Sequence, residues 1–317
     1  MTPLLDPSKI HDIWLPFTER SKLFSPIPQE NLIQGSAVKL NSNALELHDG
    51  RKIPFDFAVV ATGTKSSLKS TAWTKSQGLQ DAEELCAALK KASNIAIVGG
   101  GQVGVELAAK LCSELPNTHV DLLHRSSTLL SKMAGMNDAA RKKILAVLQQ
   151  FPNITIRLQD TIVNSDIPRK DISFERCLLH TQSGNQINAD VTILTTGNIP
   201  NSKFVADGLG KSVLDQNGYV RTNPDGSVEG FPHIFSAGDI STLDSVKLAH
   251  QAVNQAEIVS KNISVLIEAG YFGQNDIQVG KLKLQKYSPA QKWLARVNLG
   301  QLGSVMKIWF LVIHSKK

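Results

Sequence analysis

Short apolar runs separated by turn residues dominate the stretch from position 37 to position 61. Ala37–Leu40 and Ala44–His48 flank a polar turn, Asp49-Gly50 is a tight-turn signal, and Ile53–Phe57 follows it. Phe57–Ala61 is apolar throughout, which is typical of a strand buried on both faces. This part of the chain is therefore expected to form a set of short strands that ends at a Thr-Gly pair.

From position 81 onward the chain alternates between helical and strand patterns. Apolar residues three and four positions apart predict helices over four ranges: Asp81–Lys91, Val103–Leu115, Asn137–Gln150 and Lys247–Ala269. Compact apolar runs predict strands over three more: Ile95–Val98, His119–His124 and Ile154–Leu158. Strands that alternate with helices predict an α/β architecture with largely parallel sheets.

The hairpin-and-strand pattern occurs twice. A shift of 134 residues aligns positions 47–63 with 181–197 and matches five residue pairs. These pairs are Gly50 with Gly184, Ile53 with Ile187, Asp56 with Asp190, Thr62 with Thr196, and Gly63 with Gly197. A duplication is the favoured interpretation, although any polar hairpin that feeds a buried strand would look similar. The same shift maps position 99 to −35, so the first copy is expected to lack a glycine-rich turn of its own.

That glycine-rich turn carries most of the chemistry. Gly99, Gly101 and Gly104 form a G-x-G-x-x-G motif between a predicted strand and a predicted helix. The first glycine allows the tight turn, the second lets a pyrophosphate approach the backbone, and the third lets helix and strand pack closely. A pyrophosphate would then lie at the positive end of the helix. Dinucleotide binding is predicted, and a plain strand–helix turn is the alternative.

The end of the next strand lacks the acidic residue that commonly holds the ribose of NAD. His124 and Arg125 stand there instead, and the nearest acid, Asp121, lies earlier in the strand. A basic pair would accommodate a 2′-phosphate, which slightly favours NADPH over NADH; the alternative is a pair that merely ends the strand in solvent. Glu106, in the first turn of the helix, is either a helix-start carboxylate or a residue beside the nicotinamide.

A second nucleotide signal lies near the end of the chain. Phe235-Ser-Ala-Gly238-Asp239 ends an apolar run and precedes the longest predicted helix, which starts near Lys247. A carboxylate after a strand can bind ribityl or ribose hydroxyls, and a helix N-terminus can stabilise negative charge on a reduced ring. An isolated Gly-Asp pair is common in loops, but this one follows the two Thr-Gly strands in the expected order.

Composition narrows the class of protein. The chain has 317 residues, 42% hydrophobic and 20% charged, with 34 basic and 28 acidic residues for a net charge of +6. This profile predicts a soluble globular protein of about two domains, with mild attraction to anionic surfaces. Three widely spaced cysteines form no metal-binding or redox pair, so no metal site is expected and a reducing, cytoplasmic compartment is favoured. Because the basic residues are scattered, no sequence-specific nucleic-acid binding is expected.

The C-terminal tail leaves two interpretations open. The run from Val305 to Ile313 is too short to span a bilayer. It could rest at a membrane surface, with Trp309 and the terminal lysines as anchors. A buried strand of a C-terminal interface segment is the favoured alternative, and no secretory signal opens the chain.

Four segments together resemble the pyridine-nucleotide flavoproteins with two dinucleotide-binding domains: ATGT (61–64), GGGQVGVELA (99–108), TTGNIPNS (195–202) and FSAGDI (235–240). Within that superfamily the chain is most similar to the apoptosis-inducing-factor-like group that includes ferroptosis suppressor proteins. The resemblance implies an FAD enzyme that oxidises NADH or NADPH and reduces a quinone. It also implies possible association with mitochondria, membranes or lipid droplets.

The resemblance assigns roles residue by residue. It implies that Gly99, Gly101, Gln102, Gly104 and Glu106 line the nicotinamide dinucleotide, with Gly197 closing that pocket. Glu106 and Lys247 would form the catalytic pocket around the stacked rings, Lys247 at the pyrimidine edge of the flavin. Cofactor contacts to FAD would come from Ala61, Thr62, Gly63, Gly238 and Asp239.

The expected architecture is two Rossmann-like, three-layer domains. An FAD-type domain over 1–90 and 198–272, incomplete at its N-terminal end, would enclose an NAD(P)-binding domain over 91–197. A C-terminal interface segment would cover 273–317. The favoured function is NAD(P)H oxidation through FAD to a quinone-like acceptor. The alternative is a flavin-free, NAD(P)H-binding remnant without turnover.

Overall fold

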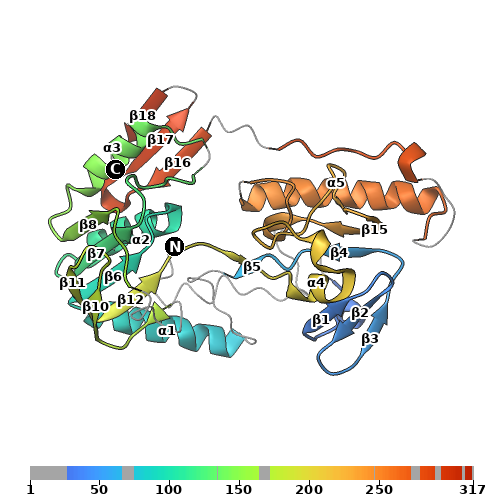
Figure 1. Cartoon of the computed structure of the whole chain (residues 1–317), viewed down its shortest axis with the longest axis horizontal. Coiled ribbons are helices and arrows are strands. Elements are labelled where there is room, and N and C mark those ends of the chain that lie inside the picture. Colours follow the sequence, from blue (N-terminus) through green and yellow to red (C-terminus); the bar gives the residue numbers. More distant parts are fainter. Residues whose placement is uncertain are drawn as a thin grey trace. The chain divides into compact units, whose positions relative to one another are not determined.

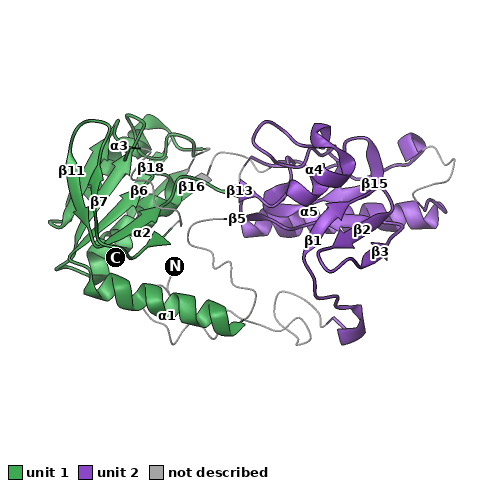
Figure 2. Ribbon diagram, turned by 60° about the horizontal axis from the view of Figure 1, so that its bottom comes forward, with its two compact units in different colours: residues 1–26, 66–198, 291–317 green, residues 27–65, 199–290 purple. Residues whose placement is uncertain are grey.

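The computed structural model describes residues 27–65, 75–133, 135–163, 172–245, 247–272, 279–289, 294–308 and 311–315. The chain divides into two compact units (Figure 2). Within the described residues, unit 1 takes its parts from 75–198 and 294–315, and unit 2 from 27–65 and 199–289.

Unit 1 is a three-layer α/β unit built on a five-stranded sheet (Figure 1). Its helices are α1 (Lys75–Lys91), α2 (Gln102–Glu114) and α3 (Asp138–Leu148), with a short 3-10 turn η8 (Gly300–Leu302). Its sheet runs in the order β8 (Ile154–Leu158), β7 (His119–His124), β6 (Asn94–Val98), β12 (Val191–Leu194) and β9 (Ile172–Ser173). The first four strands are parallel and β9 is antiparallel.

Different elements pack on the two faces of this sheet. The three helices share one apolar core with alternate residues of β6 and β7, such as Ile95, Ile97 and Leu122, all fully buried. On the other face, a hairpin of β10 (Cys177–His180) and β11 (Gln186–Ala189) packs through Leu179 and Ile187. The uninterrupted apolar strands of the sequence are therefore buried on both faces, as such strands require.

The C-terminal residues add a three-stranded antiparallel sheet to unit 1. Its strands are β16 (Leu294–Asn298), β17 (Ser304–Ile308) and β18 (Leu311–Ser315). Ala295, Val297 and Val305 join the helical core. The tail therefore forms strands, of which β17 is partly buried and β18 alternates exposed and half-buried positions. Trp309, the proposed membrane anchor, lies outside the described residues.

Unit 2 contains a meander, a small mixed sheet and one long helix. The meander is β1 (Ala37–Leu40), β2 (Ala44–Leu47) and β3 (Lys52–Pro54), and the mixed sheet runs β14 (Ser227–Val228), β15 (Phe231–Ser236) and β4 (Ala58–Val60). A two-stranded pair joins β5 (Thr64–Lys65) to β13 (Ile199–Pro200). The helices are α4 (Lys203–Leu209), α5 (Ala249–Glu268) and the 3-10 turns η3 (Gln29–Asn31), η5 (Lys211–Val213), η6 (Gly238–Ile240) and η7 (Val279–Lys281).

The two copies of the repeat differ in their surroundings. In unit 1, β12 lies between β6 and β9, and all four of its residues are buried. In unit 2, β4 pairs with β15 on one side and is the last strand of its sheet among the described residues. The prediction that 57–61 is buried on both faces is wrong, because Val59 is 48% exposed.

The compact units divide the chain at other points than the sequence analysis expects. Helix α1 begins at Lys75, six residues before the predicted start, because its first turns carry no apolar spacing. Leu85 and Leu89 of α1 pack in the unit 1 core, although residues up to 90 were expected in the FAD-type domain. Burial against the parallel sheet decides this membership, and sequence continuity does not.

Candidate functional site

The glycine-rich turn of unit 1 has the geometry that its motif predicts. Gly99 has φ = 126°, and a Cβ there would lie 2.4 Å from the carbonyl oxygen of Thr195. A Cβ on Gly104 would lie 1.9 Å from the carbonyl oxygen of Gly99, so the helix approaches the turn too closely for any side chain. By contrast, a Cβ on Gly101 would meet no atom within 4 Å. The outer side of the turn is therefore open.

The open side lies at the N-terminus of α2. Gly101 is the N-cap residue, and no side chain of the described residues caps the helix there. The first backbone N–H groups of a helix have no partner within it, and together they form a site for an anion. Uncapped N–H groups beside open space fit the pyrophosphate of a dinucleotide.

Thr195 holds this turn from the neighbouring strand and was missed by the sequence analysis as a site residue. Its hydroxyl donates to the carbonyl oxygen of Gly99 over 2.7 Å, and it follows β12 directly. Its Oγ1 would also lie 2.7 Å from a Cβ on Gly104. The first threonine of the TTGNIPNS segment was the available signal, but the contact depends on the pairing of β12 with β6.

His124 ends β7 beside the same turn. Its Nδ1 accepts a hydrogen bond from the Gly100 backbone N–H over 3.1 Å, and its Nε2 lies 3.3 Å from the hydroxyl of Ser131. Burial lowers the pKa of His124, and the neighbouring Arg125 lowers it further. Of the basic pair that the sequence suggested for a 2′-phosphate, only the exposed Arg125 is a permanent cation.

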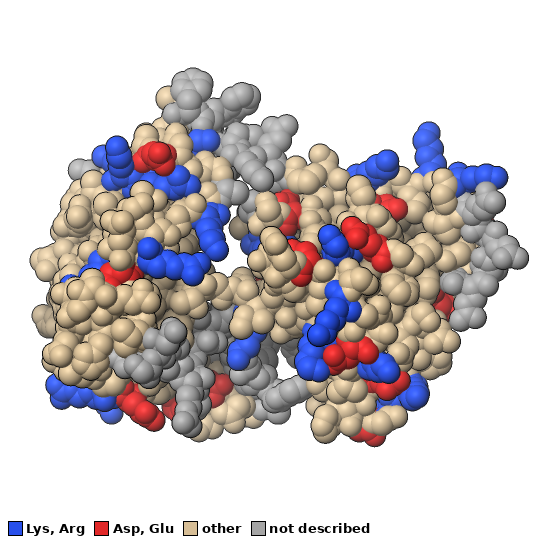
Figure 3. Space-filling view, in the orientation of Figure 1, with Lys and Arg blue, Asp and Glu red and all other residues tan. Residues whose placement is uncertain are grey.

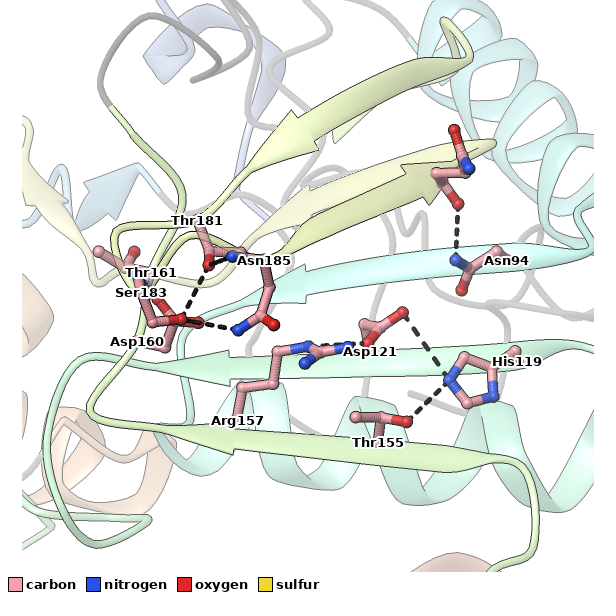
Figure 4. A network of polar contacts seen from close by, with 11 residues as sticks. Asn94, His119, Asp121, Thr155, Arg157, Asp160, Thr161, Thr181, Ser183 and Asn185 are labelled. Atoms are coloured by element: carbon pink, nitrogen blue, oxygen red, sulfur yellow. Dashed lines mark hydrogen bonds and ion pairs between the residues drawn. The ribbon is translucent and has the colours of Figure 1, made fainter.

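Asp121, the acid nearest to the end of β7, forms ion pairs inside the sheet. It is 3% exposed, and its carboxylate lies 3.2 Å from Nε of Arg157 and 3.8 Å from Nε2 of His119 (Figure 4). These partners come from β8 and from the start of β7. Asp121 is therefore a buried ion-pair partner inside the sheet rather than a ribose ligand at its edge.

Glu106 connects α2 to the C-terminal strands of unit 1. Its Oε1 accepts hydrogen bonds from Nε2 of Gln102 over 3.3 Å and from the Asn298 backbone N–H over 3.2 Å. The residue is half-buried and lies two residues beyond Gly104, past the first turn of α2 in which the sequence placed it. Gln102 and Glu106 thus form a linked polar pair on the first turns of the helix that follows the glycine motif.

The Thr-Gly pair of unit 2 is held by Asn201. The Asn201 side-chain amide donates to the Thr62 carbonyl over 2.9 Å, and its backbone N–H donates to the Gly63 carbonyl over 3.0 Å. Gly63 has φ = 61°, a Cβ on it would meet nothing within 4 Å, and Ala61 is exposed. Its repeat counterpart in unit 1, Gly197, is likewise left-handed, with φ = 130° and open space.

The Gly-Asp pair of unit 2 lies where the sequence predicts, between β15 and α5. Gly238 has φ = 79°, and its backbone N–H donates over 2.7 Å to Oε1 of the buried Gln255 on α5. The carboxylate of Asp239 lies 3.5 Å from the hydroxyl of Thr64, just past the end of β4. Gln255 was not predicted, because only the packing of α5 brings it to this loop.

Lys247 is held by its own loop. Its Nζ donates to the carbonyl oxygens of Ser241 over 2.5 Å and Asp244 over 2.6 Å, and it lies 4.7 Å from the centroid of the Tyr219 ring. Burial lowers its pKa, while Asp239, Asp244 and Asp215 favour the charged form. The ammonium therefore stabilises the loop between η6 and α5.

The predicted site residues fall into two groups. Unit 1 carries the residues predicted for the nicotinamide dinucleotide: Gly99, Gly101, Gln102, Gly104, Glu106, His124, Arg125 and Gly197. Unit 2 carries those predicted for FAD: Ala61, Thr62, Gly63, Gly238, Asp239 and Lys247. The first group fits a dinucleotide at an uncapped helix. The second fits the ribityl end of FAD, and no glycine-rich strand–helix turn accompanies it among the described residues of unit 2.

Three further features of the described residues bear on metal, membrane and nucleic-acid binding. Within the described ranges, no cluster of three or more potential metal ligands occurs. No helix in the described part of the chain is long and apolar enough to cross a membrane. On the face drawn in Figure 3, basic and acidic side chains are interspersed, and no continuous basic patch is visible there.

Comparisons with known proteins agree with a dinucleotide-binding site. The model of the pyridine nucleotide-disulphide oxidoreductase family matches residues 25–256, and the chain belongs to this family. The chain is 25% identical to apoptosis-inducing factor homolog A of Dictyostelium discoideum over 300 residues, 89% of this chain and 70% of that protein. It is 24% identical to ferroptosis suppressor protein 1 of Xenopus tropicalis over 241 residues, 74% of this chain and 63% of that protein.

A solved structure shares the fold. The ferredoxin reductase of the CYP199A2 system from Rhodopseudomonas palustris superposes with a TM-score of 0.63 at 16% identity, covering 96% of this chain and 71% of that one. The resemblance and the α/β fold with Rossmann-like domains, predicted from the sequence, are thus confirmed. FAD and NADH or NADPH are the cofactors of the family to which the chain belongs.

Proposed function

We propose that the chain is an FAD-dependent NAD(P)H oxidoreductase that passes electrons to a quinone or a similar acceptor. The observation that carries the proposal is the turn from Gly99 to Gly104, whose open, uncapped side fits a dinucleotide pyrophosphate. Membership of the pyridine nucleotide-disulphide oxidoreductase family supports the oxidoreductase class. The quinone is proposed from the resemblance to ferroptosis suppressor proteins.

The residues of the chain would bind and orient the two cofactors. Bound FAD supplies the redox chemistry, and the protein supplies orientation and charge. The α2 N-terminus would hold the pyrophosphate, and the Gln102–Glu106 pair would line the nicotinamide. In unit 2, Asp239 would accept hydrogen bonds from ribityl hydroxyls. Lys247 would keep positive charge close to that site.

An absorption spectrum tests the proposal directly. The purified full chain, incubated with FAD and passed through a desalting column, is expected to retain a flavin band that bleaches on addition of NADPH or NADH without air. Reoxidation by a soluble quinone is then expected. A chain that retains a flavin band which does not bleach would contradict the oxidoreductase function.

One observation favours a second candidate, a flavin-free dinucleotide-binding protein. In unit 1, β12 is flanked by the strand that carries the glycine-rich turn, whereas the corresponding edge of β4 has no strand partner among the described residues. A colourless protein that takes up no FAD but binds NADH would support this candidate over the enzyme.

Arg125 supports a preference for NADPH. It is exposed at the end of β7, where an acid would repel a 2′-phosphate, and guanidinium groups bind phosphate well. Arg125→Gln is expected to weaken NADPH binding by roughly tenfold, about 1.4 kcal/mol, and to change NADH binding little. Arg176→Gln, at an exposed arginine ahead of β10 in the same unit, is the matched control. Equal losses for both nucleotides would contradict the preference.

We also propose peripheral membrane contact through β18. Leu311 and Ile313 are 54% and 43% exposed on its outer side, and apolar side chains can insert at a bilayer surface. Deletion of 305–317 would remove buried Val305, so Leu311→Ser with Ile313→Ser is the sharper test. Flotation with anionic liposomes is expected to fall in this double variant, and unchanged flotation would contradict the contact.

A further inference from the structure

His124 lies against Gly100, the one glycine of the turn that the motif does not require. A Cβ on Gly100 would lie 2.8 Å from Cγ and 2.9 Å from Cβ of His124, and 2.5 Å from a methyl group of Leu129. Gly100 is therefore a glycine because the imidazole and Leu129 fill the space beside it. The end of β7 and the dinucleotide turn are fitted to each other at this point.

The hydrogen bonds fix the protonation state of the ring. The Gly100 backbone N–H can only donate, so Nδ1 of His124 must be the acceptor and the single ring proton must lie on Nε2. Nε2 then donates to the hydroxyl of Ser131, and Ser131 donates in turn to the hydroxyl of Ser126 over 3.2 Å. In this series of hydrogen bonds, each donor faces an acceptor only when His124 is neutral.

We infer that neutral His124 is a positioning residue that holds the Gly99–Gly104 turn in its dinucleotide-binding conformation, so that protonation of His124 weakens nucleotide binding. A proton on Nδ1 would face the Gly100 N–H at a distance that suits only a donor and an acceptor. The turn would then have to move or the ring to rotate out. The inference rests on the proposed dinucleotide site, and it concerns binding rather than turnover.

Arg125 is the charged group that acts on the imidazole, and it favours the neutral form. Arg125 adjoins it in sequence. The loop and helix that follow β7 carry two further cations, Lys132 and Arg141, and Arg141 donates to the Leu130 carbonyl. After the end of β8, the backbone N–H of Asp160 donates to the His124 carbonyl. The Asp160 carboxylate itself accepts from the side chain of Ser183 over 2.5 Å and from the backbone N–H of Thr161 over 2.9 Å (Figure 4). Burial lowers the pKa of His124 most, and Arg125 lowers it further. A backbone hydrogen bond to Thr128 raises it, and the net shift is downward.

The opposite role makes the opposite prediction. A protonated His124 that bound the 2′-phosphate would strengthen NADPH binding in acid and leave NADH unaffected. A positioning residue that must be neutral predicts that NADH binding, which involves no 2′-phosphate, weakens as the pH falls. NADH is therefore the informative probe, because its affinity does not depend on the ionisation of a 2′-phosphate.

The test is the dissociation constant of NADH for the full chain between pH 8 and pH 5.5, from the fluorescence of the bound nucleotide. The constant is expected to be flat above neutrality and to rise below the pKa of His124, approaching tenfold per pH unit. Burial and Arg125 hold that pKa below the ordinary histidine value. A constant that does not change with pH, or that falls in acid, would overturn the inference. Absence of saturable binding at pH 8 would instead contradict the proposed dinucleotide site.

Two variants separate positioning from simple stability. His124→Asn keeps an acceptor oxygen close to the position of Nδ1 but cannot titrate, so it is expected to bind NADH at pH 8 within about threefold of the parent and to lose the acid weakening. His124→Leu has no acceptor and is expected to bind weakly at every pH. His119→Asn, at the start of the same strand, is the control and should keep the parental pH profile. Acid weakening that persists in His124→Asn would overturn the inference even if His124→Leu fails to fold.

Discussion

Gly101 and Gly104 belong to one motif but meet different surroundings. A side chain at position 101 would enter open space, whereas one at position 104 would collide with the backbone of Gly99. Gly101 therefore leaves room for the ligand, and Gly104 allows α2 to pack closely on β6. The motif predicts this division of roles, and the distances agree with it.

The alanine variants of these glycines should separate binding from stability. Gly101→Ala is expected to keep its free energy of unfolding within about 0.5 kcal/mol and to bind NADH at least roughly tenfold more weakly. Gly104→Ala is expected to lose about 1–3 kcal/mol through overpacking. Urea unfolding and NADH titration measure both effects. A Gly101→Ala protein that binds like the parent would place the pyrophosphate elsewhere.

Asp190, which matches Asp56 in the internal repeat, has a structural role. Its carboxylate accepts from the backbone N–H groups of Ser93 and Asn94 over 2.8 and 3.0 Å, and these hydrogen bonds lower its pKa. A lowered pKa in the folded state means that the stabilisation is present above the unfolded value of about 3.9 and disappears as the pH falls through the folded value.

Asp190→Asn is expected to lower the free energy of unfolding by about 1 kcal/mol at pH 7. The difference from the parent should shrink below about pH 4, where the parent carboxylate becomes protonated. Urea unfolding at pH 7 and pH 3.5 measures it. Asp56→Asn, at the exposed repeat counterpart in unit 2, is the control. A difference that stays constant with pH would show that Asp190 does not act through its charge.

At the scale of elements, the two copies of the repeat place similar strands in different surroundings. Val59 of β4 and Ile193 of β12 occupy the same repeat position, 134 residues apart. Val59 is 48% exposed, and Ile193 is fully buried. Their apolar character is alike, but β12 lies between two strands, whereas β4 pairs with one strand among the described residues.

Threonine substitutions at these two positions make a matched test. Val59→Thr is expected to change the free energy of unfolding by less than about 0.5 kcal/mol, because the hydroxyl remains in water. Ile193→Thr is expected to cost about 2–4 kcal/mol, because it removes buried methyl groups and buries a hydroxyl. Chemical unfolding measures both. A large loss for Val59→Thr would mean that a further layer covers β4 in the folded protein.

At the scale of the whole molecule, each cofactor is expected to stabilise its own unit. A ligand that binds only the folded state stabilises it by about 2.7 kcal/mol at 100 times its dissociation constant. NADH should slow amide hydrogen exchange at 99–106 and 124–131 of unit 1. FAD should slow it at 61–64 and 238–249 of unit 2. Hydrogen exchange with mass spectrometry, with each cofactor alone, checks the assignment. Protection by NADH confined to unit 2 would contradict the division of the site residues.

The sequence by itself determined the period of each element, the glycine-rich turn and the order of the nucleotide signals. The strands Ala37–Leu40, His119–His124 and Ile154–Leu158 occur with the predicted bounds. These features are local, because turn glycines and apolar periodicity act over a few residues. The same locality explains why the α/β class and the family could be predicted.

The tertiary structure decided what each local feature faces. It placed α1 in the core of unit 1, left Val59 exposed, and brought Thr195 and Gln255 to loops far away in the sequence. It also placed His124 where its Nδ1 accepts a hydrogen bond from the Gly100 backbone N–H, which a count of basic residues could not anticipate. Burial and hydrogen-bond partners are set by strand pairing and helix packing over long sequence separations, and a linear pattern does not specify them.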